Sequence, residues 1–347
     1  MQTINTALLS FGMSGWVFHA PFLSVHNGFT FAGVWERTKN LAQERYPGVR
    51  TFRTLDELLA DPSIELVVVN TPNYTHFDYT RRALLAGKNV VVEKPFTVTV
   101  AEGEELLALS QQKGLLLSVY HNRRFDSDYK VVRRVVTEGM LGSIVEAEFH
   151  FDRYKEDLSP KVHKESPGPG TGALYDLGSH LVDQALQLFG MPDAVFADIR
   201  IVRQVSQVDD YFELLLYYPD KRVRLRSSYL VREALPAYIL HGTKGSFIKS
   251  KSDVQETALQ ANQSPADPSW GPEPESERGL LHTERNGTII REFLPSEHGH
   301  YGAYYEGIYQ ALRHEGPNPV PAADGLNVIR VITAAFESNE TKQVISM

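Results

Sequence analysis

The sequence predicts an α/β fold in two parts. Residues 4–120 alternate between short β-rich runs and helical patterns, which is typical of repeated βαβ units and therefore of a doubly wound parallel sheet. After residue 190 the β-rich runs follow one another without helices between them, which indicates a mainly antiparallel sheet. The length of 347 residues is natural for two domains of about 150 residues each. We expect a first domain at residues 1–122 and a second α/β domain at residues 123–347.

The composition argues against several classes of protein. Hydrophobic residues make up 42% and charged residues 22%, as in ordinary soluble proteins, and the formal net charge of −8 argues against nucleic acid or an anionic membrane as a partner. Cysteine is absent, so disulfides, thiolate metal sites and cysteine nucleophiles are excluded. No cationic segment precedes an apolar run at the N-terminus, and no apolar run reaches membrane length. We therefore expect a cytoplasmic protein.

The elements of the first domain alternate in order. The β-rich runs are bounded by turn residues, and several helical runs have a capping residue or a proline or glycine at the expected end. We expect strands near Ile4–Phe11, Phe29–Val34, Arg50–Phe52, Ile64–Asn70, Val90–Glu93 and Leu115–Val119. We expect helices near Gly15–Val25, Lys39–Arg45, Leu55–Ala60, Tyr74–Ala86 and Ala101–Lys113. The result is a sheet of about six strands.

The first strand runs into the turn Ser10-Phe11-Gly12-Met13-Ser14-Gly15. Glycines at this spacing, directly before a helix, form a partial dinucleotide-binding fingerprint in which serine takes the place of the first glycine. Gly12 would let the backbone approach a pyrophosphate, and Gly15 would let the helix pack closely with its N–H groups directed at the phosphates. We expect a cofactor to contact Gly12, Ser14, Gly15 and Trp16.

The second strand ends in Glu36, where a carboxylate can accept hydrogen bonds from the adenosine ribose hydroxyls of NAD. The next residues, Arg37-Thr38-Lys39, leave an alternative open: Arg37 and Lys39 could hold the 2′-phosphate of NADP while Glu36 turns aside. A third interpretation is a solvated charged turn. The cofactor is thus NAD or NADP, and the pattern does not choose between them.

The fourth strand ends in Asn70-Thr71-Pro72-Asn73-Tyr74-Thr75-His76. In open α/β sheets the ligand crevice lies outside the carboxyl ends of the strands, so we place Thr71, Pro72, Asn73 and His76 near the ribose or nicotinamide. The same residues are also typical of a loop followed by a helix N-cap, and that interpretation stays open.

The stretch Asn89-Val90-Val91-Val92-Glu93-Lys94-Pro95 reads as a buried central strand that ends in a lysine followed by proline. By the same rule, Lys94 points into a ligand site, and Glu93 lies beside the cofactor. The alternative is an ordinary strand end at the surface.

A helix near residue 180 carries the other candidate residues. At about 100° per residue, Asp176, His180, Asp183 and Gln187 form one polar stripe opposite an apolar one. A solvated amphipathic surface helix would show the same pattern. The segment before it, residues 167–172, is rich in glycine and proline and would be a mobile or close-packed edge.

Three of these signals together resemble the Gfo/Idh/MocA family of NAD(P)-dependent oxidoreductases: the glycine turn, Glu93-Lys94-Pro95, and Asp176-Leu177-Gly178-Ser179-His180. The similarity covers nearly the whole chain. It implies a Rossmann domain followed by an α/β domain with a large open antiparallel sheet, and dimerisation through that sheet. The segments around Tyr120–Asp126, Phe151–Tyr154 and Leu174–His180 are most similar to the branch that oxidises inositols. Ser10 departs from the family pattern.

The resemblance also implies roles for individual residues. Lys94 is the substrate-binding lysine beside the nicotinamide, His180 the catalytic acid/base, and Asp176 its partner in positioning the substrate. It suggests a cis peptide between Lys94 and Pro95. Asn122, Arg153 and Tyr154 are further candidate substrate contacts, and Asn122 is also a candidate for the cofactor. The expected substrate lies between the two domains.

In the second half, strands are expected at Asp193–Arg203, Asp209–Tyr218, Lys221–Tyr229, Tyr238–His241 and Ser246–Lys249. In the third of these strands, arginines alternate with Val223, Leu225 and Ser227. One face of the strand is therefore expected to be exposed to solvent and the other to pack against the core. Residues 262–279 form a long loop with Trp270 as its anchor. The tyrosines between residues 301 and 309 are expected in a helix core, with the alternative that Tyr301 reaches a sugar, and the last helix spans about Ala322–Glu337. His298-Gly299-His300 lacks further ligands nearby, so no metal site is expected.

The leading hypothesis is hydride transfer between NAD(P) and a CH–OH group of a polyol or sugar. The alternative is a regulator or sensor that binds NAD(P) without turnover. Retention of Lys94, Asp176 and His180 together argues for the enzyme, because a sensor has no chemical need of all three. A related oxidoreductase acting on biliverdin-like or diol substrates fits the Asp176/His180 pair less well. The expected partners are a small polyol or sugar and a second copy of the chain.

Overall fold

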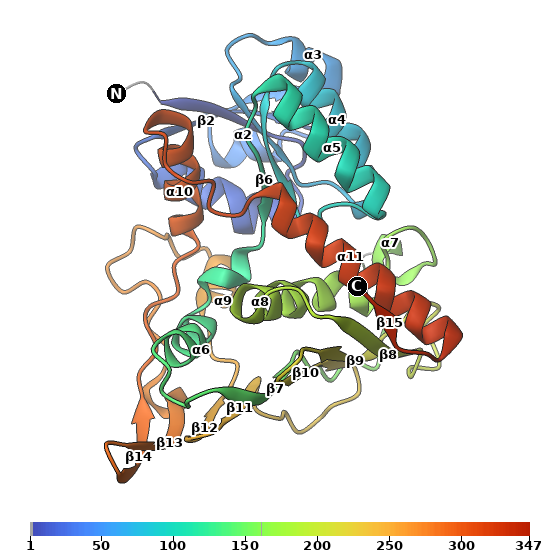
Figure 1. Cartoon of the computed structure of the whole chain (residues 1–347). Coiled ribbons are helices and arrows are strands. Elements are labelled where there is room, and N and C mark those ends of the chain that lie inside the picture. The colour runs from blue at the N-terminus through green and yellow to red at the C-terminus, as the bar shows by residue number, and fades with distance from the viewer. Residues whose placement is uncertain (1–2, 161) are drawn as a thin grey trace. The chain divides into compact units, whose positions relative to one another are not determined.

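The computed structural model describes residues 3–160 and 162–347, which form two compact units (Figure 1). Unit 1 consists of residues 1–122, 254–270 and 300–326, and unit 2 of residues 123–253, 271–299 and 327–347. The first boundary between the units lies after Asn122. Unit 1 also includes residues 254–270 and 300–326, which lie within the range expected for the second domain.

Unit 1 is built on a six-stranded sheet in the order β3-β2-β1-β4-β5-β6, and every adjacent pair is parallel. The predicted doubly wound sheet is thereby confirmed. Its strands are β1 (Ile4–Leu8), β2 (Phe29–Trp35), β3 (Arg50–Phe52), β4 (Leu66–Val69), β5 (Asn89–Glu93) and β6 (Leu117–Tyr120). The connecting helices are η1 (Ser14–His19), α1 (Ala20–Val25), α2 (Leu41–Arg45), α3 (Leu55–Ala60), η2 (Asn73–Thr75), α4 (His76–Leu85) and α5 (Val100–Lys113).

Local sequence signals account for these elements. Every residue of β4 is buried, as expected for a central parallel strand covered on both faces. α3 and α5 both begin with a capping box, in which a threonine and a glutamate three residues later bond each other's backbone N–H. α5 ends at Gly114, which has a φ of 62° and so takes the left-handed conformation of a helix stop.

Unit 1 is completed by segments from late in the chain: α9 (Gln255–Gln260), α10 (Gly302–Arg313) and residues 314–326. Tyr301, Tyr304 and Tyr305 are fully buried, which confirms the predicted aromatic core. Trp270 is also buried, and its ring meets Phe22 edge to face at 6.4 Å, so it anchors the preceding loop as expected. The boundary between the units falls within α11 (Ala322–Thr341).

Unit 2 is built on a nine-stranded sheet in the order β14-β13-β12-β11-β7-β10-β9-β8-β15. Only the pair β10–β7 is parallel, so the expected mainly antiparallel sheet is confirmed. Its strands are β7 (Ile144–His150), β8 (Ala194–Arg200), β9 (Tyr211–Tyr217), β10 (Arg222–Ser228), β11 (Tyr238–Gly242), β12 (Gly245–Lys249), β13 (Gly279–Arg285), β14 (Thr288–Leu294) and β15 (Ile345–Ser346). Its helices are η3 (Asn122–Phe125, which starts at the last residue of unit 1), α6 (Ser127–Thr137), α7 (Val162–Glu165), η4 (Leu174–Gly178), α8 (Ser179–Phe189) and η5 (Glu275–Glu277).

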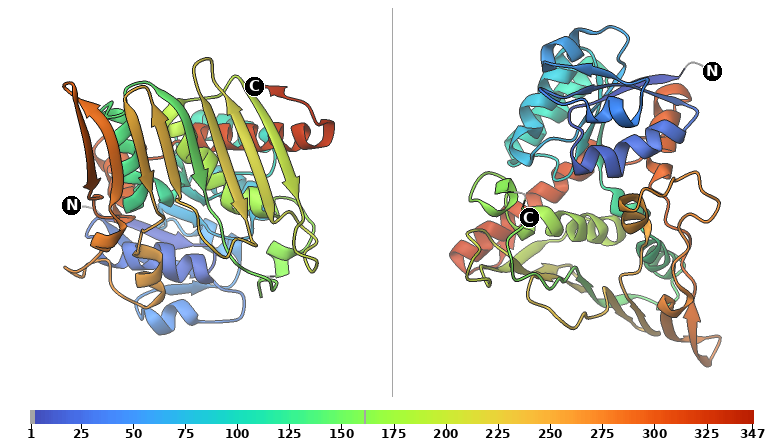
Figure 2. Two further views of the ribbon diagram at one scale, coloured as in Figure 1. Left: turned by 90° about the horizontal axis from the view of Figure 1, so that it is seen from below. Right: turned by 180° about the vertical axis from the view of Figure 1, so that it is seen from behind.

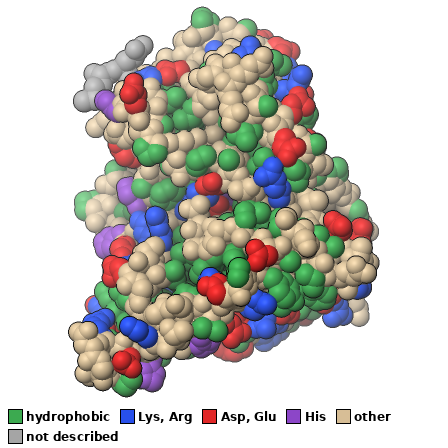
Figure 3. All heavy atoms as spheres, in the orientation of Figure 1, with side chains coloured by type: hydrophobic (Ala, Val, Ile, Leu, Met, Phe, Trp, Pro, Cys, Tyr) green, Lys and Arg blue, Asp and Glu red, His purple; other side chains and the backbone are tan. Residues whose placement is uncertain are grey.

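The helices α6 and α8 of unit 2 lie on one face of this sheet (Figure 2). Val223, Leu225 and Ser227 of β10 are fully buried, whereas the arginines between them are at least partly exposed, as the alternation predicted. The ring of Phe149 in β7 meets that of Phe189 in α8 at 6.5 Å. The face of the molecule drawn in Figure 3 carries acidic and basic side chains interspersed.

Candidate active site

The glycine turn after β1 leads into η1, a π-helical segment that continues as α1. A side chain at Gly15 would bring its Cβ to 2.4 Å from the carbonyl oxygen of Ser10, so only glycine fits. At Gly12 no heavy atom lies within 4 Å of such a Cβ, and the residue is exposed. The turn therefore leaves open the space that a pyrophosphate needs against the backbone, and it fits a dinucleotide.

Ser10, the departure from the family pattern, is held by Asn70 at the end of β4. The Ser10 backbone N–H donates to Asn70 Oδ1 at 3.0 Å, and Asn70 Nδ2 donates back to the Ser10 carbonyl at 2.9 Å. The Ser10 hydroxyl adds a third bond, to the Asn70 carbonyl at 2.9 Å. The serine thus ties the turn to the neighbouring strand, which gives the substitution a structural role.

Glu36 is buried and its carboxylate faces the start of α2. It accepts hydrogen bonds from the backbone N–H groups of Leu41 at 3.3 Å and Ala42 at 3.0 Å. The carboxylate therefore satisfies amides that a helix N-terminus leaves unpaired. Arg37 beside it is exposed. Arg53 holds this loop by donating to the carbonyls of Glu36 at 2.9 Å and Lys39 at 2.7 Å.

The loop after β4 carries the next group of candidates. Thr71, Pro72 and Asn73 are partly exposed, and the Thr71 hydroxyl lies 2.6 Å from that of Thr75. His76 is fully buried, with Nδ1 2.8 Å from the Pro95 carbonyl and Nε2 3.0 Å from the Thr71 carbonyl. Burial lowers the pKa of His76. This side chain links the loop to the segment that follows Lys94.

The carboxylate of Glu93, at the end of β5, is in contact with three other groups. Its Oε1 accepts from the Ser14 hydroxyl at 2.5 Å and lies 3.0 Å from Nε2 of the buried His19, while Oε2 accepts from the Lys94 N–H at 3.2 Å. The other ring nitrogen of His19 lies 2.6 Å from the Tyr305 hydroxyl. Burial opposes the charge, but the bonds from His19 and Ser14 outweigh it and lower the pKa of Glu93 to about 2.

These contacts connect the two cofactor signals of the sequence within unit 1. Ser14 belongs to the glycine turn, and Glu93 directly precedes Lys94. The peptide between Lys94 and Pro95 is cis, as the resemblance implied. Lys94 is partly exposed, following three fully buried valines. Glu93 thus positions the backbone of Lys94, a function that the sequence had not indicated for it.

In unit 2, Asp176 lies in η4 and His180 in the first turn of α8. A π-helical turn contains one residue more than an α-turn, so the positions before it are rotated by up to about 100° from the regular wheel. The expectation that these residues form one stripe on a regular α-helix is therefore wrong. Asp183, which shared that stripe, is buried and forms two bonds with Arg124, at 2.9 and 2.6 Å.

His180 is 6% exposed and its ring stacks on that of Phe151, with centroids 6.3 Å apart and planes 27° apart. The Asp176 carboxylate accepts from Lys164 Nζ at 2.8 Å. Lys164 comes from α7, whose next residue, Glu165, pairs with the buried Arg203 at 3.0 Å. A candidate acid/base and a candidate substrate-binding carboxylate therefore lie on one helical segment.

Asp209 anchors the N-terminus of this segment. Its Oδ2 accepts from the Leu174 N–H at 2.8 Å, and its carbonyl accepts from the Ala173 N–H at 2.7 Å. Burial raises the pKa of Asp209 to about 6. Gly172 has a φ of 97°, and a Cβ there would lie 1.8 Å from Asp209 Oδ1. The glycine-rich segment is thus the close-packed edge of the two alternatives that the sequence left open.

The remaining candidates have varied surroundings. Trp16 is partly buried under the guanidinium of Arg45, at 5.3 Å. Asn122 is buried at the start of η3, two residues after β6. Tyr154 is exposed, with the Arg232 guanidinium 3.9 Å from its ring centroid. Within the described residues, no group of three or more histidines and carboxylates could hold a metal ion.

Sequence reasoning missed His19, Lys164 and Asp209. His19 had a detectable signal, because it is a polar residue within an otherwise apolar helical run. Lys164 and Asp209 had none: the first lies in a four-residue helix and the second in the connection between two strands. Their importance follows from contacts that are distant in sequence.

Comparison with known proteins agrees with this construction. Residues 4–121 match the model of the oxidoreductase family's NAD-binding Rossmann fold, and residues 133–347 match that of its C-terminal α/β domain. The chain belongs to the Gfo/Idh/MocA oxidoreductase family. It is 40% identical over 347 residues, 100% of this chain and 97% of the relative, to the scyllo-inositol 2-dehydrogenase (NADP(+)) IolW of Bacillus subtilis strain 168.

Two solved structures of oxidoreductases are also similar. The oxidoreductase YvaA from Bacillus subtilis has 39% identity and a TM-score of 0.95, covering 100% of this chain and 99% of that one. An oxidoreductase from Bacteroides fragilis has 48% identity and a TM-score of 0.91, with 100% of both chains covered. The protein is therefore an NAD(P)-binding oxidoreductase of the Gfo/Idh/MocA family. In the part of the chain that the structure describes, no helix is long and apolar enough to cross a membrane.

Proposed function

We propose that this oxidoreductase transfers hydride between NADP and a CH–OH group of a polyol or sugar of the inositol type. The observation that carries the proposal is the pairing of His180 and Asp176 on one segment of unit 2, in a chain 40% identical to a scyllo-inositol dehydrogenase. Histidine is the side chain whose ordinary pKa suits proton transfer near neutral pH. The stack on Phe151 fixes the orientation of its ring.

Each residue has a distinct part in the proposed reaction. A bound nicotinamide would supply the hydride acceptor for this reaction. Removal of hydride requires loss of the hydroxyl proton, which His180 takes as general base. Lys94 hydrogen-bonds the reacting oxygen and stabilises the negative charge that develops on it. Asp176 accepts a hydrogen bond from a neighbouring hydroxyl and thereby orients the substrate, in exchange for its contact with Lys164.

The first prediction concerns the proposed catalytic residues. His180→Ala and Lys94→Ala should each lower kcat severely, by roughly 10²–10⁴ for the histidine, because the proton acceptor is lost. The Kd for NADPH should change little. The measurement is NADPH formation with scyllo-inositol, myo-inositol and a panel of sugars, together with fluorescence titration of NADPH. Near-normal turnover in either variant would rule out the assigned role, and tight NADPH binding without turnover in the wild type would favour the sensor.

Preference for NADP is supported by the direction of the Glu36 carboxylate. Both of its oxygens accept hydrogen bonds from the amides of Leu41 and Ala42, so part of the capacity of the carboxylate is used within the protein. The exposed Arg37 then offers a cation for a 2′-phosphate. The similar enzyme from Bacillus subtilis is named for NADP(+).

The second prediction tests this preference. Arg37→Ala should weaken NADPH binding by about 10- to 100-fold, the range for a hydrogen bond to a charged group, and leave NADH binding nearly unchanged. Glu36→Ala should weaken both cofactors alike, because it disturbs α2. Fluorescence titrations with both cofactors measure these effects, and Arg81→Ala, an exposed arginine of α4, serves as the control. Equal losses for NADH and NADPH in Arg37→Ala would contradict the assignment.

A further inference from the structure

Phe151 and Tyr229 in unit 2 form an aromatic platform beside the catalytic segment. Phe151 stacks on His180, as described above. Tyr229 is connected to Asp176 through two contacts: Arg203 lies over the Tyr229 ring and pairs with Glu165, and the preceding residue, Lys164, binds Asp176. A group that touches both rings therefore lies next to both proposed substrate-binding side chains of unit 2.

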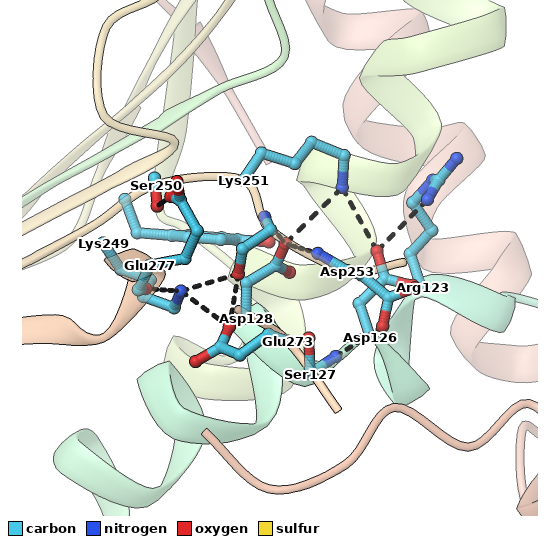
Figure 4. Close-up of polar contacts among 12 residues, drawn as sticks. Arg123, Asp126, Ser127, Asp128, Lys249, Ser250, Lys251, Asp253, Glu273 and Glu277 are labelled. Atoms are coloured by element: carbon cyan, nitrogen blue, oxygen red, sulfur yellow. Dashed lines mark hydrogen bonds and ion pairs between the residues drawn. The ribbon is translucent and has the colours of Figure 1, made fainter. Parts of the chain in front are cut away.

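Four cations pack against this platform, and three of them have carboxylate partners. Arg123 and Lys251 lie 5.2 and 4.8 Å from the centroid of Phe151, and both contact the buried Asp126 at 3.2 Å (Figure 4). Arg203 lies 4.7 Å from the centroid of Tyr229 and pairs with Glu165 at 3.0 Å and Asp210 at 2.8 Å. The charge of each of these side chains is thus neutralised within the protein.

Arg153 is the exception. Its guanidinium carbon lies 5.3 Å from the centroid of Phe151 and 5.9 Å from that of Tyr229, so it contacts both rings. Among the described residues, no carboxylate pairs with it and no acceptor takes a hydrogen bond from its side chain. Its nitrogen atoms are also not buried. Its backbone, in contrast, is fixed by bonds to Ser228 and Val231, both at 2.9 Å.

This arrangement is suited to an anion. A guanidinium beside aromatic rings keeps its N–H groups available in its own plane, where they match a carboxylate or phosphate in a two-bond geometry. The rings restrict the side chain before binding, so less entropy is lost when the pair forms. A neutral hydroxyl group can accept from only some of the N–H groups of the guanidinium.

We propose that Arg153 is a specificity-determining residue that binds an anionic group, carboxylate or phosphate, on a polyhydroxylated substrate. The inference rests on the proposed function, because it places the anion beside the hydroxyl that His180 deprotonates. The substrate class is then a sugar acid or sugar phosphate, for which neutral polyols are poorer stand-ins.

The test compares three ligands that differ at one carbon: D-glucose, D-glucuronate and D-glucose 6-phosphate. Binding to the NADP-loaded protein is measured by calorimetry, and hydride transfer is measured separately by NADPH absorbance. We expect one of the two anions to bind about 10- to 100-fold more tightly than glucose, and the preferred one identifies the group. Arg153→Ala should abolish this difference, because it weakens binding of the preferred anion much more than binding of glucose. Arg153→Lys should retain part of it, because the charge stays and the fork geometry is lost.

Arg222→Ala is the matched control, since Arg222 also lies over an aromatic ring, Tyr217 at 4.6 Å, but on the open sheet face. It should bind all three ligands like the wild type. Anions that bind no better than glucose, or an equal loss for all ligands in Arg153→Ala, would overturn the inference. Selective anion binding without hydride transfer from any compound would instead overturn the proposed function and leave the role of Arg153 standing. If Arg153→Ala fails to fold, the ligand preference of Arg153→Lys decides.

Discussion

At the scale of single residues, the sequence predicted which side chains stand at strand ends and helix starts, but not where they point. Lys94 could be found because it follows a buried strand, and His180 because its motif is distinctive. Glu36 is expected to accept hydrogen bonds from a ribose. Its carboxylate also accepts from the amides of α2, a helix of five residues whose start has no side-chain cap of its own. Such a contact depends on a short helix that periodicity cannot place precisely.

The third prediction belongs to this scale and concerns His19. Removing its ring takes one hydrogen-bond donor from the Glu93 carboxylate, which fixes the backbone of Lys94. His19→Ala should cost about 1–3 kcal/mol of stability and lower kcat more than it raises KM for substrate. Thermal unfolding and steady-state kinetics measure the two effects.

His26→Ala is the control for His19, because His26 also pairs with a glutamate, Glu306 at 2.9 Å, but at a more exposed position. It should have little effect on either quantity. His19→Gln, which can still donate to Glu93, should recover part of kcat. A loss of stability in His19→Ala with unchanged kcat would show that the histidine only supports the core.

At the scale of elements, regular patterns were predictable and irregular ones were not. The strands of unit 1 and the alternating β10 follow from periodicity. The strands β7, β13, β14 and β15 and the helix α6 were not predicted. β14 exposes most of its residues on both faces, so no alternation marks it. The π-turns of η1 and η4 were also missed, because a pattern of 3.6 residues per turn does not reveal one inserted residue.

The fourth prediction tests the placement of η4. Gly172→Ala forces a Cβ into the Asp209 carboxylate and a side chain into a left-handed conformation, so the N-terminal anchor of η4 must shift. Backbone strain of this kind costs about 1–3 kcal/mol. We expect a drop in kcat of at least about tenfold, since Asp176 and His180 follow on the same segment.

Gly168→Ala is the matched control, because the nearest heavy atom to its Cβ is 3.9 Å away, in ordinary contact. It should retain wild-type kinetics and thermal stability. If both glycine variants behave alike, the segment before η4 does not control the geometry of the catalytic residues.

At the scale of the whole molecule, the order of helices and strands along the chain predicts the two kinds of sheet. It does not predict which segments of the chain make up each unit. The segments 254–270 and 300–326 return to unit 1, where buried tyrosines of α10 complete its core. Aromatic residues predict burial but do not say against which sheet. The long-range contacts that decide this, such as Tyr304 to Ser118 at 2.7 Å, have no local signature in the sequence.

The open face of the nine-stranded sheet carries a row of aligned side chains, one from each of eight strands. Strand register places them in the order Phe196, Leu215, Arg224, Glu148, Ile239, Ile248, Leu280 and Phe293. Six of these are apolar and all are at least partly exposed. The central Arg224 pairs with Glu148 on the same face. An apolar row that spans a sheet is typical of a surface that another protein covers.

The fifth prediction is that a second copy of the chain covers this face. A symmetric dimer would bury the row against its counterpart, and a lysine at its centre would place unpaired charges in the interface. Ile248→Lys should therefore shift the protein from dimer to monomer in analytical ultracentrifugation at micromolar concentration. Leu85→Lys makes the same kind of change at an exposed apolar residue of α4 and should leave the dimer intact. A wild type that sediments as a monomer, or an Ile248→Lys variant that stays dimeric, would place the interface elsewhere or remove it.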